Sequence, residues 1–300
     1  MKKTATTRNL TERWMRLFFF LVALTSLTAL FLITVFLIKE GLPIFKTVSV
    51  REFIFGQYWY PTSDPPDFGI FPLIVASLLV TLFSGLIAVP LGIMTAIYIA
   101  EMASARVSEI VKPMVELLAA LPSVVIGFFG MVLVAPFLQR VFGIPTGLNM
   151  FNASLMLAFM SIPTICSISE DAIHSVPAAL KEASIALGAS HLQTLVRVIL
   201  PAAISGISTA VILGLSRAIG ETMVVLMVAG GAAMIPRSLF DPVRPMPASI
   251  AAEMAEAPLG SEHYYALFAT GIVLFIMTLS FNIIADYLSH KYRRVGEASL

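Results

Sequence analysis

Two charged side chains, Arg217 and Glu221, interrupt an apolar stretch between Pro201 and Pro236 that contains no other ionisable residue. On a helix, a spacing of four residues places both on one face, where a guanidinium and a carboxylate can touch. Charges inside a membrane are costly and usually face a bundle interior or a water-filled path, together with a partner. The pair is therefore a candidate transport site. The alternative is an ion pair that only holds its helix against neighbouring helices.

The composition places these charges inside a membrane. Hydrophobic residues are 58% of the 300-residue chain, charged residues are 12%, and the mean hydropathy is +0.91, which excludes an ordinary soluble domain. The one cysteine, Cys166, cannot form an internal disulfide, and no group of Cys and His residues has metal-ligand spacing. The net charge of +1 does not indicate a nucleic-acid partner.

Six segments are apolar over the length of about 20 residues that a spanning helix needs, so the predicted fold class is an all-α integral membrane protein. They cover residues 17–38, 70–100, 117–138, 150–169, 202–228 and 264–287. The basic tail 1–16 before the first segment also fits a secretory signal. We favour an uncleaved first span, because the segment is longer than a usual signal core and no small-residue cleavage site follows it before Lys39.

The distribution of lysine and arginine predicts the orientation. These residues concentrate in the N-terminal tail and in the other segments on the same side of the membrane. By the positive-inside rule this side is cytoplasmic, and an even number of spans places both termini there. Residues 39–69 then form an outer loop, and residues 170–201, between the fourth and fifth spans, form a cytoplasmic loop.

Turn and capping residues organise the loop 170–201 into two short helices. Pro177 fits the first position of a helix, and Gly188 fits the residue just past its end. Ser190 followed by Gln193 resembles a capping box that opens a second helix, which leads into the fifth span. Such an element is too short to cross the membrane and is suited to contact with a cytosolic partner. The alternative is an ordinary amphipathic connector.

The same loop carries a spaced motif. Glu182-Ala183-Ser184, Gly188 and Val198-Ile199-Leu200-Pro201 resemble the EAA motif of ABC importer permeases, E-A-A-x3-G-x9-I-x-L-P, with Ser184 in place of an alanine and Val198 in place of an isoleucine. The resemblance implies the six-helix fold of type I (MetI-like) importer permeases. It also implies a coupling helix that docks on an ATP-hydrolysing subunit. The residues that it assigns to ATPase coupling are Glu182, Ala183, Gly188, Leu200 and Pro201.

The chain has no G-x-x-x-x-G-K-[ST] phosphate loop, so we expect a transport subunit without enzymatic activity and without a cofactor of its own. ATP and Mg²⁺ would be bound by two partner ATPase subunits. On this interpretation the chain divides into a cytoplasmic basic tail (1–16), the first transmembrane helix (17–38), a periplasmic loop (39–69), the permease domain (70–288) with its coupling loop (170–201), and a cytoplasmic tail (289–300).

The residues around the charged pair narrow the resemblance. Ser216-Arg217-Ala218-Ile219-Gly220-Glu221-Thr222-Met223 resembles the R-A-x-G-E-T signature of the phosphate-specific permease family, PstC and PstA. The long outer loop 39–69 and the sequence Ile250-Ala251-Ala252-Glu253 look more like the PstC type. The resemblance extends over essentially the whole chain. It implies an importer of inorganic phosphate in the bacterial inner membrane, with a PstA-like companion permease, a periplasmic phosphate-binding protein and surrounding membrane lipid.

The chemistry of the pair agrees with an anionic substrate. A guanidinium stays protonated and matches phosphate oxygens bidentately, so Arg217 would attract the anion in the substrate pathway. Glu221 would pair with Arg217 when the path is empty, or accept a hydrogen bond from a protonated phosphate. Ser216 and Thr222 offer hydroxyl donors nearby. Two alternatives remain. One is a permease for another oxyanion, such as sulfate or molybdate, which brings no proton for Glu221. The other is an ion-coupled secondary transporter, against which the coupling motif argues.

Overall fold

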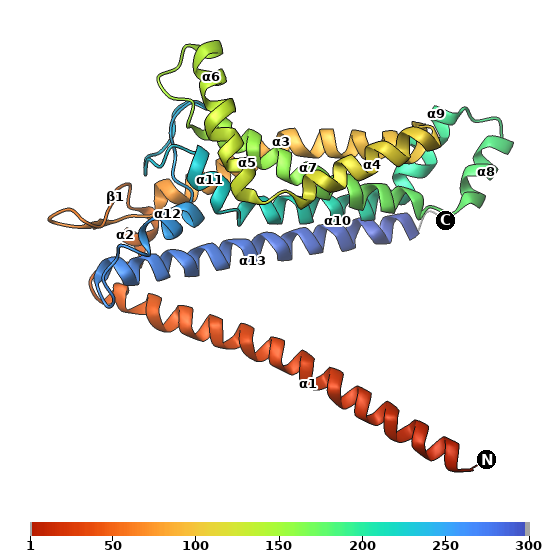
Figure 1. The fold of residues 1–300 in the computed structure, drawn as a ribbon, viewed down its shortest axis with the longest axis horizontal. Coiled ribbons are helices and arrows are strands. Elements are labelled where there is room, and N and C mark those ends of the chain that lie inside the picture. Colours follow the sequence, from red (N-terminus) through yellow and green to blue (C-terminus); the bar gives the residue numbers. More distant parts are fainter. Residues whose placement is uncertain (1, 298–300) are drawn as a thin grey trace.

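The structure is a computed structural model that describes the backbone of residues 2–297 and the side chains of residues 12–284, 286 and 287. Helices dominate the described chain, with one short hairpin (Figure 1). The α-helices are α1 (Lys2–Gly41), α2 (Val50–Phe55), α3 (Phe71–Ile97), α4 (Ala105–Ala120), α5 (Ser123–Phe129), α6 (Ala135–Phe142), α7 (Met150–His174), α8 (Ala178–Ala186), α9 (His191–Thr194), α10 (Leu200–Ile219), α11 (Met223–Val228), α12 (Met246–Glu253) and α13 (Glu262–Glu297). The antiparallel strands are β1 (Trp59–Tyr60) and β2 (Asp67–Phe68). The remaining helical turns are the 3-10 turn η1 (Leu42–Lys46) and the π turns η2 (Tyr98–Met102), η3 (Gly130–Val134) and η4 (Leu195–Ile199).

Six helical runs within the described residues are long and apolar enough to cross a membrane, which confirms the predicted class and the number of spans. They are Glu12–Lys46, Phe71–Met102, Ser123–Phe142, Met150–His174, His191–Ile219 and Glu262–Ile284. The predicted start of the third span is wrong. This run begins at Ser123 because Pro122 disfavours helical backbone at Leu121, so residues 117–120 belong to α4.

The fifth predicted span, 202–228, is not one helix. A continuous helical run starts in the loop 170–201 at His191 and ends at Ile219, and α11 begins only at Met223. Gly220 follows the last turn of α10, where glycine has low helix propensity and commonly ends helices. A break over residues 220–222 therefore separates α10 from α11.

The terminal helices extend beyond the predicted first and last spans. Helix α1 runs from Lys2, in the predicted tail, through the first span as one helix, and α13 continues from the last span to Glu297. The side chains of the predicted tail 289–300, including Lys291, Arg293 and Arg294, lie outside the described residues.

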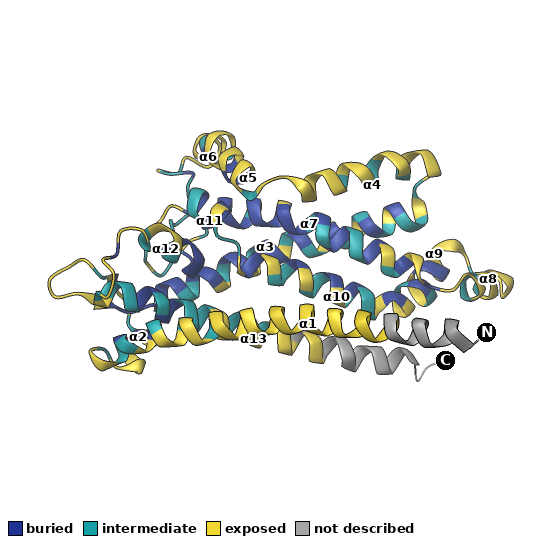
Figure 2. Ribbon diagram, turned by 60° about the horizontal axis from the view of Figure 1, so that its bottom comes forward, coloured by how far each residue is buried: buried dark blue, intermediate teal, exposed yellow. Residues whose placement is uncertain are grey.

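Helix α7 forms the centre of the bundle, with α3, α10 and α4 packed around it (Figure 2). Glycines allow the close approach. A Cβ atom at Gly92 of α3 would lie 2.8 Å from the side chain of Ile165 in α7, and one at Gly214 of α10 would lie 2.5 Å from that same side chain. Ile165 is fully buried between the two glycines. Because the packing is close, displacement of α3, α7 or α10 requires the other two helices to move as well.

Helix α1 diverges from the bundle (Figure 1). Near its C-terminal end it packs on α13, where Phe36 lies edge-on to Phe268 with ring centroids 5.6 Å apart. Along the rest of the described helix the side chains are almost all exposed, and most are apolar. A helix that is apolar all round is typical of a membrane span that contacts lipid or another subunit.

At the end of the bundle opposite α8 (Figure 1), a cluster of side chains surrounds Glu253 of α12, and we call this cluster the outer cap. The carboxylate of Glu253 is only 13% exposed and contacts side chains from segments far apart in the sequence. These side chains are Trp59 of β1 (3.0 and 3.1 Å), Arg244, Ser249 (3.1 Å) and His263 of α13 (2.8 Å). The cap fixes the hairpin, α12 and the start of α13 relative to one another.

Candidate functional site

The coupling loop 170–201 adopts the predicted arrangement of helix, glycine turn and second helix. Helix α8 begins directly after Pro177, which is its N-cap and not its first residue as predicted. Gly188 follows the helix with φ of +87°. A Cβ atom at this glycine would meet nothing within 4 Å, so the positive φ and not the lack of space is what favours glycine here.

The predicted capping box is confirmed. The Ser190 hydroxyl accepts from the backbone N–H of Gln193 at 3.3 Å, and the Gln193 side chain accepts from the backbone N–H of Ser190 at 2.9 Å. From α9 the helical run continues through η4 into α10. The wider π turn comes directly before Pro201, whose ring does not fit against the carbonyl four residues earlier in a regular helix. The second helix of the loop and α10 thus belong to one helical run.

The coupling loop lies at one end of the bundle (Figure 1), and several of its apolar side chains are exposed. Leu187 is 90% exposed, Leu192 is 67% exposed and Ile185 is 55% exposed. Large apolar side chains exposed on one short segment are typical of interaction surfaces. Sequence reasoning missed these side chains, although apolar residues next to a glycine turn were the available signal.

The predicted coupling residues are divided between this surface and the helix behind it. Glu182, Ala183 and Gly188 are exposed in the loop, Pro201 is exposed at the start of α10, and Leu200 is partly buried. Ser184, which replaces an alanine of the motif, lies 2.9 Å from the hydroxyl of Thr194 and so joins α8 to α9.

Arg217 and Glu221 do not form the predicted pair on one helix face, and the described residues contain no ion pair between them. Glu221 lies in the break after α10. Its Oε1 accepts hydrogen bonds from the backbone N–H groups of Met223 at 3.2 Å and Val224 at 3.4 Å. The prediction is wrong because the helix ends before Glu221, whose carboxylate then caps the unsatisfied donors at the start of α11.

The two predicted hydroxyl donors also have protein partners. Ser216 donates to Oδ1 of Asn282 in α13, and Thr222 donates to the carbonyl oxygen of Gly220 at 3.3 Å. Arg217 differs from both. Its side chain is exposed, and within the described part of the chain its guanidinium has neither a hydrogen bond nor an ion pair. A free cation thus lies in the last turn of a membrane helix.

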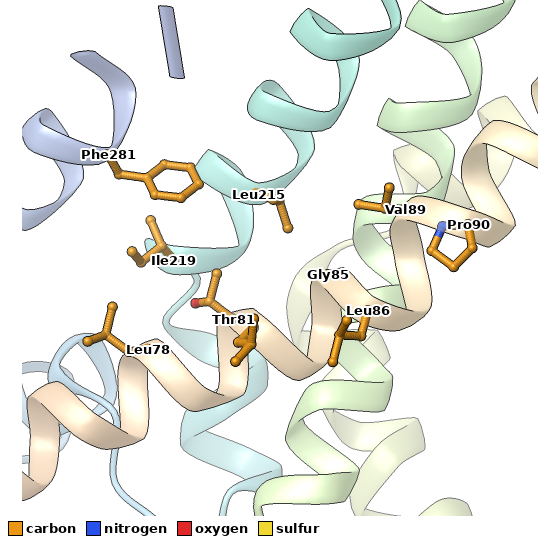
Figure 3. A pocket seen from close by; sticks show the side chains of 10 residues that line it. Leu78, Thr81, Gly85, Leu86, Val89, Pro90, Leu215, Ile219 and Phe281 are labelled. Atoms are coloured by element: carbon orange, nitrogen blue, oxygen red, sulfur yellow. The ribbon is translucent and has the colours of Figure 1, made fainter. Parts of the chain in front are cut away.

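An apolar cavity of about 630 Å³ lies between α3, α10 and α13 (Figure 3). Its lining residues are Leu78, Thr81, Leu82, Gly85, Leu86, Val89, Pro90, Leu215, Ile219 and Phe281. Among these residues, Thr81 alone has a polar side chain. Its hydroxyl donates a hydrogen bond to the carbonyl oxygen of Ser77 at 2.8 Å. The cavity suits a hydrocarbon chain and has no donors for an anion.

Fold and site together define a multi-pass membrane protein with exposed apolar side chains at the end where α8 and α9 lie. Residues 88–294 match the family described as binding-protein-dependent transport system inner membrane component, and the chain belongs to this family of ABC importer permeases. It is 34% identical to the phosphate transport system permease protein PstC of Mesorhizobium japonicum, covering 79% of this chain and 77% of that one. It is 30% identical to PstC of Haemophilus influenzae, covering 89% and 92%.

A further relative carries no substrate in its name. The probable ABC transporter permease protein YqgH of Bacillus subtilis is 39% identical, with 90% of this chain and 88% of that one covered. Among solved structures, a bacterial alginate ABC transporter in complex with a pentasaccharide-bound periplasmic protein matches with a TM-score of 0.60 at 17% identity, over 90% of this chain and 94% of that one. The MetNI methionine ABC transporter matches with a TM-score of 0.56 at 20% identity, over 75% and 94%. These two likenesses show the fold.

Proposed function

We propose that this chain is the permease subunit of an ATP-driven importer of inorganic phosphate. The observation that carries the proposal is Arg217, an exposed guanidinium in a membrane helix with no partner in the described chain. A cation within a membrane span needs a counter-charge, and an oxyanion supplies one with matching geometry. The relatives named as phosphate transport permeases support phosphate as this anion.

In the proposed mechanism, Arg217 attracts the anion and Glu221 shapes its surroundings. Glu221 does not pair with Arg217, because its Oε1 accepts hydrogen bonds from backbone N–H groups at the start of α11. Its Oε2 has no hydrogen-bond partner among the described residues. That oxygen is free to accept a hydrogen bond from a protonated phosphate oxygen, which fully deprotonated sulfate or molybdate does not offer.

ATP hydrolysis would reach this site through the coupling loop. The exposed surface of α8 and α9 would dock on one of two ATPase subunits, which bind ATP and Mg²⁺. The continuous helical run from His191 to Ile219 would carry the movement to Arg217. A PstA-like companion permease would form the other half of the path, and a periplasmic phosphate-binding protein would deliver the anion to the outer side. Both termini would lie in the cytoplasm.

Uptake of radioactive phosphate by proteoliposomes containing the assembled importer tests this function. We expect uptake that requires ATP and the binding protein, stops with vanadate, and persists when an ionophore removes ion gradients. Excess sulfate or molybdate should leave it unchanged. Uptake that follows the ion gradient without ATP would indicate a secondary transporter, and ATP-driven uptake of sulfate or molybdate in place of phosphate would identify a different oxyanion permease.

A further inference from the structure

The coupling loop takes part in an ion pair whose two residues, Glu101 and Lys181, are not among those that the EAA motif assigns to ATPase coupling. Glu101 is in η2, the π turn that ends α3, and its carboxylate pairs with Lys181 of α8. The side chain of Glu101 is only 7% exposed, and that of Lys181 is 26% exposed. Exposed ion pairs contribute little, whereas a pair so far removed from water is costly to break by removing one partner.

The main chain of Glu101 holds the second half of the loop. Its carbonyl oxygen lies 3.2 Å from Nε2 of His191, the first residue of α9. A carbonyl oxygen can only accept, so Nε2 carries the hydrogen and donates it. Glu101 therefore contacts α8 through its carboxylate and α9 through its backbone.

Apolar packing supports the same junction. Buried side chains of η2, α7 and η4, among them Ile99, Ile173 and Leu195, belong to one cluster. A close-packed cluster of this kind resists sliding of the loop over the end of α3. Farther along α3, a Cβ atom at Gly85 would lie 2.7 Å from Leu215 of α10, two residues before Arg217. Helix α3 thus contacts the loop at one end and, at Gly85, contacts α10, the helix that carries Arg217.

We propose that Glu101 is a positioning residue that fastens the coupling loop to the end of α3, so that displacement of the loop moves α3 together with α10. The chain itself connects the loop only to α7 and α10, and Glu101 adds the third attachment. The consequence for transport rests on the proposed function, whereas the fastening does not depend on the substrate.

Hydrogen exchange on the importer, purified through a tag on this chain, tests the fastening. Glu101→Gln should increase exchange of backbone amides in α8 and α9 by about tenfold, because local opening becomes easier. Introducing Glu101→Lys together with Lys181→Glu should restore protection to within about threefold of the unsubstituted protein. As a control, Glu40→Gln removes the Lys39–Glu40 pair within a single helix and should leave α8 and α9 unaffected. Unchanged protection in Glu101→Gln, or no restoration in the reversed pair, overturns the proposal.

ATP-driven uptake tests the consequence. Glu101→Gln combined with Lys181→Met leaves no unpaired buried charge, so this double variant should assemble with a Tm near that of the unsubstituted protein. Its phosphate uptake per ATP hydrolysed should fall about fivefold or more, the scale of a typical coupling between sites. Unreduced uptake in the double variant would overturn the proposal. An unsubstituted complex that hydrolyses ATP without importing phosphate would contradict the proposed function, and the exchange experiment would still decide whether Glu101 fastens the loop.

Discussion

The outer cap and the coupling loop lie at the two ends of the helix bundle, and they differ in whether this chain supplies partners for their side chains. In the outer cap, the carboxylate of Glu253 is surrounded by donors that this chain itself supplies. In the coupling loop, Leu187 and Leu192 extend into open space without apolar neighbours to cover them. The outer cap therefore satisfies its charges within this chain, whereas the coupling loop leaves apolar side chains uncovered.

The difference follows from what each end must do with its polar and apolar groups. A carboxylate removed from water is tolerated only where charged or polar donors replace the water, and Arg244, His263 and Trp59 do so for Glu253. Apolar side chains that are exposed to water are stabilised only when a partner covers them and removes them from water. Substitutions in the outer cap should therefore reduce stability, and substitutions on the surface of the coupling loop should reduce association.

The largest effect on stability is expected for Glu253→Ala. Removing the carboxylate leaves Arg244 without its charge partner in a partly buried position, which costs about 2–3 kcal/mol. Thermal unfolding of the purified protein measures the change. Glu256→Ala, which removes an exposed carboxylate from the same segment, should change the free energy of unfolding by less than about 0.5 kcal/mol. Equal Tm values for the two variants would contradict the assignment of the outer cap as a stabilising centre.

A smaller effect, on association alone, is expected for Leu187→Ser. Because this side chain is 90% exposed, its loss should leave the Tm unchanged, while association with the ATPase subunit weakens about tenfold or more. Leu259→Ser is a matched control, since Leu259 is 87% exposed but lies in the segment between α12 and α13 at the outer side. Co-purification of the ATPase subunit with each variant measures the difference. If both variants retain the ATPase equally, the coupling loop is not the docking surface.

The smallest effect on ATPase association is expected for Gly188→Ala. At φ of +87°, a Cβ atom costs about 1–2 kcal/mol. Gly143→Ala carries the same kind of strain, with φ of +63° and open space around the Cβ position, at the end of α6. Both variants should lose similar stability, and only Gly188→Ala should also weaken ATPase association. Identical association for the two would show that the shape of the glycine turn does not matter for docking.

Local features of the coupling loop were predictable from the sequence. Gly188 and the Ser190–Gln193 capping box depend on residues that are close neighbours in the chain, so their types and spacing carry the information. The spans were equally predictable, because hydropathy over a helix length reports burial in lipid.

Features that depend on distant contacts or on a single break were not predictable. The apolar pattern continues through Gly220, so nothing in its periodicity indicated that α10 ends there and that Glu221 caps α11. The contact between Trp59 and Glu253 joins residues 194 positions apart, and that between Glu101 and Lys181 joins residues 80 apart. Their roles follow from packing of the whole bundle.

The most direct test of the central claim is phosphate uptake by the assembled importer carrying Arg217→Ala. Loss of a charged hydrogen-bonding partner should reduce ATP-driven uptake about tenfold to a hundredfold, with ATPase association retained. Arg217→Lys keeps the charge but lacks the guanidinium fork. Its phosphate uptake should lie between that of Arg217→Ala and that of the unsubstituted protein. Arg140→Ala, at an exposed position in the last turn of α6, is the control and should transport normally. Normal phosphate uptake by an assembled Arg217→Ala importer would contradict the account.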